Sequence, residues 1–308
     1  MSLLTVRHVT IYRYADPVEL GEHRMMFRPR ESHDLRLIAA QLDIVPQPTQ
    51  LRWVHDVFDN SVAVATFSER TNELRFDSTV TLEHIETELP DYALEPAAAT
   101  YPFAYARDDL PNLAPALQRQ SPAADIDRWA ASFLAPSVST DTIALLRAMT
   151  VGIREQVAYT RRTERGVQTP SETLRRGSGS CRDFALLMIE GVRSLGLAAR
   201  FVSGYIFVPN AEPSGTLGGG ATHAWLQVYL PGAGWVDFDP TNRMIGNRNL
   251  VRVAVAWDPA HALPLWGSFI GSASSFLGME VAVSVVDGTR PAQGRSNGRK
   301  RPRTSSAT

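Results

Sequence analysis

Apolar and polar residues alternate along much of the first ninety residues of this chain. The alternation is the two-residue period of a β-strand with one buried face, and β-branched and aromatic residues fill many of its apolar positions. It runs through five segments that Asp-Asn or proline turns separate: residues 4–14, 35–45, 51–58, 61–67 and 74–82. Short strands joined by turns predict a β-sandwich domain over residues 1–90.

The period changes to that of an α-helix in the second part of the chain. Apolar residues recur at steps of three and four from position 181 to position 195, which places them on one face of a helix. Residues 129–134 and 141–157 predict two earlier helices. Residues 91–122 are rich in alanine and proline and predict a linker between two domains.

Strand patterns return after the helix that begins at position 181 and predict a second sheet. Residues 198–208 and 224–230 are rich in β-branched and aromatic residues, and the turn Pro-Gly-Ala-Gly at 231–234 leads directly into another strand. Residues 251–256 and 279–286 also alternate, and we expect them to be strands that complete a sheet.

The chain has a single cysteine, and its position favours a chemical role. Cys181 follows Gly-Ser-Gly-Ser and opens the predicted helix. Free backbone N–H groups and the helix dipole favour an anion in the first turn, so a thiol at such a position ionises more readily and becomes a nucleophile. The structural alternative for a lone cysteine is a small buried apolar side chain.

A predicted hairpin brings a histidine and an acid together downstream of the cysteine. If the turn centres at Gly232, His223 lies nine residues before it and Asp239 seven after it, so both side chains lie on one face at diagonal positions. Asp237 has the same parity but lies nearer the turn, so Asp239 is the preferred partner. A carboxylate there would hold the imidazole in one tautomer and stabilise the imidazolium. Cys181, His223 and Asp239 thus predict a nucleophile, a base and an orienting acid.

These motifs resemble the bacterial transglutaminase-like superfamily. Four stretches carry the resemblance: residues 179–185 (GSCRDFA), 195–205 (LGLAARFVSGY), 222–225 (THAW) and 234–241 (GWVDFDPT). It implies an α+β fold with a papain-like core, in which a helix carrying Cys181 at its N-terminus packs on an antiparallel sheet. It also implies that Cys181, His223 and Asp239 form the catalytic triad. The backbone N–H of Cys181 would be one donor to an oxyanion. Tyr159, an aromatic residue upstream of the cysteine, is either a second donor or a residue of the core. The N-terminal part, including residues 28–33, resembles the domain appended to this core.

The resemblance implies an enzyme that acts through a thioester. The Cys181 thiolate would attack an amide carbonyl, and His223 would protonate the departing amine. Water then resolves the thioester in a cysteine peptidase or amidase, which is the preferred interpretation, whereas an amine resolves it in a protein-glutamine acyltransferase. A further alternative is a non-catalytic protein-interaction module. The presence of all three triad residues favours an enzyme.

Composition limits the possible partners. The chain has 308 residues, 44% of them hydrophobic, and a formal net charge of −1, so no nucleic-acid partner is expected. There is no apolar run long enough to span a membrane, and we expect a soluble cytoplasmic protein with no membrane association. The histidines lack ligand spacing and no nucleotide-binding motif occurs, so neither a metal nor another cofactor is expected. The expected partner is a peptide or protein substrate, and the oligomeric state stays open.

The remaining expectations concern specificity and domain limits. The glycine-rich loop of residues 209–220 could recognise the substrate. Three arginines that precede Cys181 could also bind the substrate, or they could belong to a solvated charged loop: Arg161, Arg162 and Arg165. The catalytic domain is expected to span residues 123–289. Residues 290–308 carry six basic residues and no acidic one, and they predict a disordered basic tail.

Overall fold

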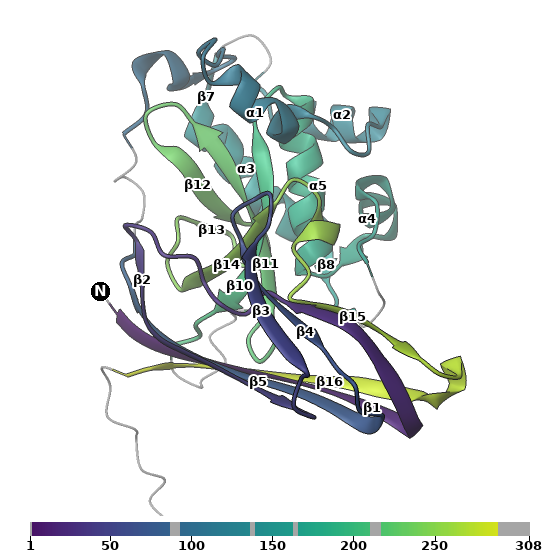
Figure 1. Cartoon of the computed structure of the whole chain (residues 1–308). Coiled ribbons are helices and arrows are strands. Elements are labelled where there is room, and N and C mark those ends of the chain that lie inside the picture. Colours follow the sequence, from purple (N-terminus) through teal and green to yellow (C-terminus); the bar gives the residue numbers. More distant parts are fainter. Residues whose placement is uncertain (1, 87–92, 136–138, 163–165, 210–216, 289–308) are drawn as a thin grey trace, which may run out of the picture.

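A computed structural model describes residues 2–86, 93–135, 139–162, 166–209 and 217–288. It contains two main β-sheets, and the helices gather around one of them (Figure 1). One sheet consists mainly of strands from the N-terminal part, and the other follows the long helix that begins at Cys181. The fold is therefore α+β, as the hydrophobic pattern and the resemblance predict.

The first sheet is built around one long strand, β1 (Ser2–Met25). The first half of β1 pairs with β5 (Thr71–His84), and its last residues pair with β4 (Ser61–Thr66). β2 (Leu35–Val45) lies beyond β5, and β3 (Gln50–His55) lies beyond β4. The sheet curls, and the second half of β1 contributes buried residues from Tyr14 to Met25 to one apolar core. Leu4 and Val6, in the first half of β1, belong to another core.

The C-terminal strands extend the first sheet. β15 (Leu265–Ile270) and β16 (Phe276–Asp287) both pair with β1 in antiparallel register. Residues 279–286, which are expected to complete a sheet, complete the first one, and residues 1–90 supply only part of this curled seven-stranded sheet. Alternation reveals a strand and its buried face, but it does not reveal which other strand this strand pairs with.

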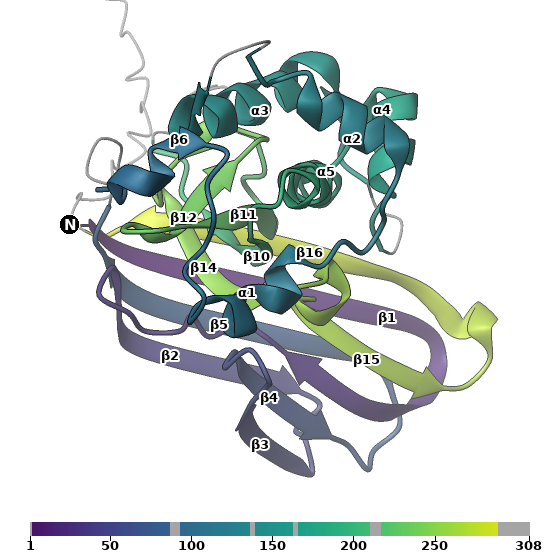
Figure 2. The same cartoon turned by 90° about the horizontal axis from the view of Figure 1, so that it is seen from above.

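The second sheet is antiparallel, with the strand order β13-β12-β11-β10-β14. Its strands are β10 (Ala199–Ile206), β11 (His223–Leu230), β12 (Gly234–Asp239), β13 (Met244–Ile245) and β14 (Leu250–Ala256). Helix α5 (Cys181–Ser194) packs on β11, and its apolar face joins Leu226 and Phe238 in one core. In Figure 2, α5 is seen nearly end-on between β11 and three further helices: α2 (Ala124–Ala131), α3 (Thr142–Gln156) and α4 (Pro170–Arg176). None of the described helices is long and apolar enough to cross a membrane.

Residues 93–122 are more ordered than the predicted linker. They contain a short 3-10 helix (Pro96–Ala98), the strand β6 (Thr100–Tyr101), which pairs with β7 (Thr140–Asp141), and helix α1 (Leu110–Leu117). The Tyr105 hydroxyl donates to the carbonyl of Tyr229 and accepts from the N–H of Ala198. The alanines that look like linker residues in the sequence allow close packing here, and Ala98 and Ala116 are buried.

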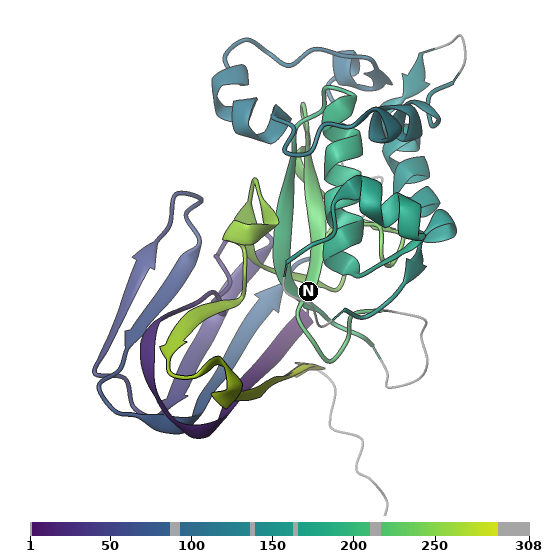
Figure 3. The ribbon, with the colours of Figure 1, turned by 90° about the vertical axis from the view of Figure 1, so that its right-hand side faces the viewer.

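The two sheets share an apolar core. Figure 3 shows the first sheet lying against one end of the helix-covered part. Five residues of the shared core are aliphatic side chains of β1, β5 and β14: Leu4, Val6, Val80, Val251 and Val253. Polar contacts flank this core. Nδ1 of His8 lies 2.9 Å from the hydroxyl of Tyr205, and the side chain of Asn60 exchanges two hydrogen bonds with the backbone of Val255. The first sheet therefore supports the second one directly.

Candidate active site

Cys181 begins α5 because the preceding residues turn the chain sharply. Gly177 ends α4 in the left-handed conformation, with a φ of 60°. β9 (Ser178–Gly179) then pairs with β8 (Ala158–Tyr159), and Ser180 is the N-cap of α5. The backbone N–H of Cys181 therefore belongs to the first helical turn, where it has no carbonyl partner within the helix.

The hairpin of β11 and β12 brings His223 and Asp239 together. Gln227 pairs with Asp237, which centres the hairpin on Gly232 and places Asp239 diagonally across from His223, as the residue count predicts. Nε2 of His223 is 2.8 Å from Oδ2 of Asp239. The two residues are 1% and 0% exposed, respectively. Because water is excluded, the interaction is stronger than it would be at the surface.

Burial and charge act in opposite directions on this pair. Burial alone would lower the pKa of His223, but the charge and hydrogen bond of Asp239 outweigh it and raise this pKa to about 10. Burial would raise the pKa of Asp239, whereas the imidazolium and hydrogen bonds from Asn242 lower it. The pair therefore favours imidazolium and carboxylate at neutral pH.

Cys181 acts on the same imidazole from α5. Its proximity contributes to the raised pKa of His223 through hydrogen bonding and charge. Nδ1 of His223 is buried and makes no well-aligned hydrogen bond to a described residue. This nitrogen is available for proton exchange, because catalytic hydrogen bonds often align only once a substrate is bound. The structure thus brings the three predicted residues together from α5, β11 and β12.

Asp237 binds Trp225 instead of His223. Nε1 of Trp225 donates a hydrogen bond of 2.6 Å to Oδ1 of Asp237. The indole stacks on the imidazole of His223, with ring centroids 5.8 Å apart and an angle of 25° between the planes. The two acids of β12 therefore have different partners. Sequence reasoning missed the role of Trp225, although Trp225 lies two residues after His223 and therefore on the same face of the hairpin.

Asn242 joins the acid to the segment that precedes β11. Its Nδ2 donates to Oδ2 of Asp239 at 2.7 Å and to the carbonyl of Leu217 at 3.2 Å. Its Oδ1 accepts from the N–H of Leu217 at 2.7 Å. Sequence reasoning also missed Asn242, and its position directly after the Asp-Pro-Thr motif was the available signal.

Residues 217–222 form one wall of the site. Gly218, with a φ of 93°, lies so close to the imidazole that a Cβ atom there would be 2.6 Å from Nδ1 of His223. Two residues later, the carbonyl of Gly220 accepts a hydrogen bond of 3.2 Å from the N–H of Val283 in β16. The first sheet therefore helps to hold this wall in place.

Sequence comparisons identify the family. The Bacterial transglutaminase-like N-terminal region matches residues 4–83, and the Transglutaminase-like superfamily matches residues 132–240. The chain belongs to the transglutaminase-like superfamily. The second match includes Cys181, His223 and Asp239.

Relatives and solved structures extend over most of the chain. An uncharacterised protein of Mycobacterium tuberculosis is 30% identical in an alignment of length 295 that covers 91% of this chain and 91% of its own. One of Mycobacterium leprae is 32% identical over 113 residues, 37% of this chain and 40% of its own. The structure of a candidate cysteine protease from Cytophaga hutchinsonii has a TM-score of 0.67 at 20% identity and covers 93% of this chain and 91% of its own. This last similarity is one of fold, and it extends over nearly the whole chain.

Tyr159 lies in β8, directly beside the segment that leads to Cys181. It pairs with Gly179, and its ring meets the edge of Phe184 at a centroid distance of 6.2 Å. Burial raises the pKa of Tyr159, and the charges of Cys181 and Asp239 act in the same direction, whereas Arg161 opposes them. The phenol is therefore neutral and able to donate a hydrogen bond near the thiol. Its role as an oxyanion donor stays a prediction.

The arginines considered for substrate recognition have separate positions. Nη1 of Arg162 lies 2.8 Å from both carboxylate oxygens of Asp183, so Arg162 binds the first turn of α5. Arg161 is exposed. Arg165, residues 210–216 of the glycine-rich loop and the basic tail at residues 290–308 lie outside the described residues.

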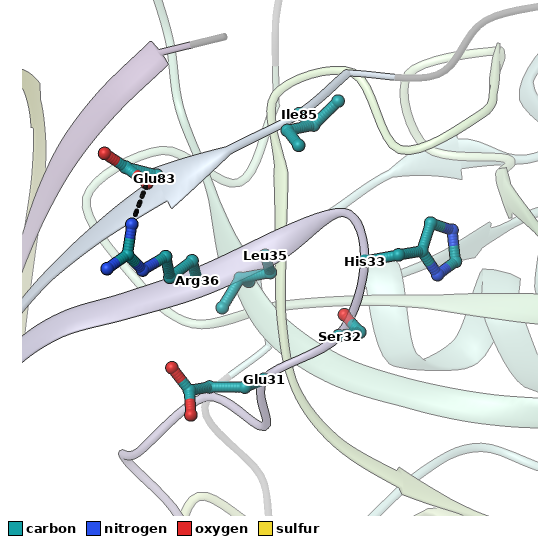
Figure 4. Close-up of a pocket in the computed structure, with 7 residues that line it drawn as sticks. All are labelled: Glu31, Ser32, His33, Leu35, Arg36, Glu83 and Ile85. Carbon is teal, nitrogen blue, oxygen red and sulfur yellow. Dashed lines mark ion pairs between the residues drawn. The ribbon is translucent and has the colours of Figure 1, made fainter.

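The loop of residues 28–33 borders an open cavity of about 280 Å³. Figure 4 shows Glu31, Ser32 and His33 along this cavity and the ion pair between Arg36 and Glu83. No residue of the triad lines it. Arg30 donates to the carbonyl of Phe58 and pairs with Asp59, so its charge is satisfied within the protein. Among the described residues, no group of three or more His, Cys, Asp or Glu side chains could hold a metal ion.

Proposed function

We propose that this chain is a thiol-dependent amide hydrolase, a cysteine peptidase or amidase that acts through Cys181, His223 and Asp239. One observation carries the proposal: Cys181 begins α5 beside an imidazole whose Nε2 is bonded to the buried carboxylate of Asp239. This arrangement supplies a nucleophile, a proton carrier and a charge that orients the carrier.

The first half of the reaction forms a thioester. The Cys181 thiolate attacks the amide carbonyl carbon, and the carbonyl electron pair moves onto oxygen. When this oxyanion collapses, the C–N bond breaks and Nδ1 of the His223 imidazolium gives its proton to the departing nitrogen. Asp239 keeps Nε2 protonated throughout, so Nδ1 is the nitrogen that exchanges the proton.

The second half releases the acid. A water molecule gives a proton to Nδ1 of His223 and attacks the thioester carbonyl. The C–S bond breaks, the carboxylic acid leaves, and the Cys181 thiolate and the His223 imidazolium are restored. An amine in place of water would give acyl transfer instead of hydrolysis.

Two donors are suited to the oxyanion. The backbone N–H of Cys181 lies in the first turn of α5, at the positive end of the helix dipole. The phenol of Tyr159, which β8 places beside this turn, is the second candidate. A donor aimed at the oxyanion typically contributes about 10²-fold or more to the rate.

The decisive experiment is the rate of iodoacetamide labelling of Cys181 between about pH 5 and about pH 9, in the wild type and in His223→Ala. The ion pair with Asp239 stabilises the imidazolium up to high pH, so the wild type should react fast near about pH 6. Loss of the imidazole should move the onset of labelling toward that of an ordinary thiol, at about pH 8 or above.

His33→Ala is the matched control, because His33 is exposed and lies in the loop of residues 28–33. It should label like the wild type. Equal, slow labelling of the wild type and His223→Ala would refute the role of Cys181 as a nucleophile. The protein would then be interpreted as a non-catalytic interaction module. If Cys181 is reactive, peptide and glutaminyl amide substrates assayed with and without a primary amine separate hydrolysis from acyl transfer.

A further inference from the structure

A buried ion pair lies directly behind the candidate nucleophile. Asp183, two residues after Cys181 in the first turn of α5, is 0% exposed. Nη1 of Arg162 lies 2.8 Å from each of its carboxylate oxygens, and the Arg162 side chain is 16% exposed. Arg162 follows β8, so the pair joins this strand region to the start of the helix.

Asp183 is also the acceptor that organises the start of α5. It accepts hydrogen bonds from the N–H and the hydroxyl of Ser180, each at 2.8 Å. It accepts two more from Gln168, from the N–H at 2.7 Å and from Nε2 at 3.3 Å. Burial would raise the pKa of Asp183, but Arg162 and these donors lower it, so the group is ionised at neutral pH. The turn that places Cys181 therefore requires a carboxylate in its interior.

The negative charge of the Asp183 carboxylate would repel a thiolate at Cys181. A fixed negative charge near a thiol disfavours ionisation, and the effect is large where water is excluded. Other charged or titratable groups near Cys181 are Arg182, the next residue of α5, His223 and Asp239 in the hairpin, and Tyr159 in β8, with Arg161 close to Tyr159. His223 and Asp239 balance each other in charge, and Arg161 and Arg182 are exposed or partly exposed, where water screens their charges. Loss of Arg162 would therefore remove the cation that is bound to the buried carboxylate of Asp183.

We propose that Arg162 is a positioning residue whose charge offsets that of Asp183, so that Asp183 anchors the first turn of α5 without disfavouring the Cys181 thiolate. The inference rests on the proposed function, because it concerns Cys181 as the nucleophile. It also gives a reason for an inward-facing arginine in a segment where sequence reasoning expected a substrate contact or a solvated loop.

The test is the pH midpoint of iodoacetamide labelling in Arg162→Gln, in Asp183→Asn and in the double variant. Arg162→Gln leaves the negative charge uncompensated and should raise the midpoint by about one pH unit. Asp183→Asn leaves the positive charge and should lower the midpoint. The double variant should return close to the wild type, because both charges are removed.

A purely structural ion pair would behave differently. Each single variant would then slow labelling by displacing the helix start, and the double variant would be no closer to the wild type than either single one. Shifts of the two single variants in the same direction, or no shift in either, would overturn the inference. Arg161→Gln is the matched control, since Arg161 is exposed and is not among the residues of the described chain that bind Asp183. The labelling midpoint of Arg161→Gln should move less than that of Arg162→Gln.

Two further measurements keep the test decisive. If Asp183→Asn unfolds, as thermal denaturation would show, Arg162→Lys replaces it, because restoring the positive charge should bring the midpoint back toward the wild type. Failure of Arg162→Lys to do so would count against the inference. A wild-type thiol that labels only above about pH 8, with no dependence on His223, would instead refute the proposed function itself.

Discussion

Individual residues near the imidazole show how little free space surrounds it. Gly218 presses against Nδ1 of His223 from one side, and Trp225 stacks on the ring. Asp239 holds Nε2. Since protein interiors are packed closely, a single added methyl group at this point cannot be absorbed without moving the ring or the backbone.

Gly218→Ala should therefore damage the site more than an equivalent change two residues away. Its Cβ atom would lie 2.6 Å from Nδ1 of His223, so we expect iodoacetamide labelling of Cys181 near about pH 6 to fall by roughly tenfold or more. Gly220→Ala is the matched control, because Gly220 also has a positive φ, 79°, but nothing lies within 4 Å of its Cβ position.

Both variants should lose about 1–2 kcal/mol of unfolding free energy through backbone strain, as denaturant titration would show. Only Gly218→Ala should lose reactivity beyond this common effect. Equal reactivity in the two variants would mean that the wall of residues 217–222 does not restrain the imidazole.

At the scale of elements, the hairpin of β11 and β12 assigns different partners to two acids of similar sequence context. Its register is centred on Gly232, so Asp239 reaches His223 while Asp237 reaches Trp225. A shift of the register by one residue would turn both acids to the other face of the sheet. The turn after β11 is thus as important for the site as the side chains themselves.

Asp239→Asn and Asp237→Asn should separate these two roles. Loss of the Asp239 charge removes the main cause of the raised pKa of His223, so labelling of Cys181 near about pH 6 should slow by about tenfold or more, with the onset moved to higher pH. In Asp237→Asn the amide oxygen can still accept from Trp225, so labelling should change by roughly threefold at most. Larger loss in Asp237→Asn than in Asp239→Asn would reverse the proposed assignment.

On the scale of the whole molecule, the chain crosses between its two sheets and returns. β15 and β16 come last in the sequence but pair with β1, and Val283 of β16 donates to the wall beside His223. The C-terminal strands therefore contribute both to the stability of the first sheet and to the limits of the site.

Truncation should expose this dependence. A chain ending at residue 262 loses β15 and β16 and leaves β1 without two of its partners, so we expect it to aggregate or to melt at a much lower temperature. A chain ending at residue 288 keeps every described strand and should melt within a few degrees of the full chain. Equal thermal stability of the two truncated chains would show that the first sheet folds without its C-terminal strands.

The amino-acid sequence by itself determined the local features of this protein. The periods of apolar residues revealed most strands of the first sheet, though not β15 or the second half of β1, and the helix that begins at Cys181. They did so because a buried face repeats every two or about 3.6 residues in the sequence. The hairpin count brought His223 and Asp239 onto one face, because pairing within a hairpin depends only on its turn.

Only the tertiary structure decided which distant segments meet. Three contacts join segments whose sequence patterns do not indicate a partner. They are the pairing of β16 with β1, the packing of residues 93–122 on the second sheet, and the ion pair between Arg162 and Asp183. The physical reason is that burial requires only some apolar or charged partner of suitable shape. The identity of that partner depends on the path of the whole chain.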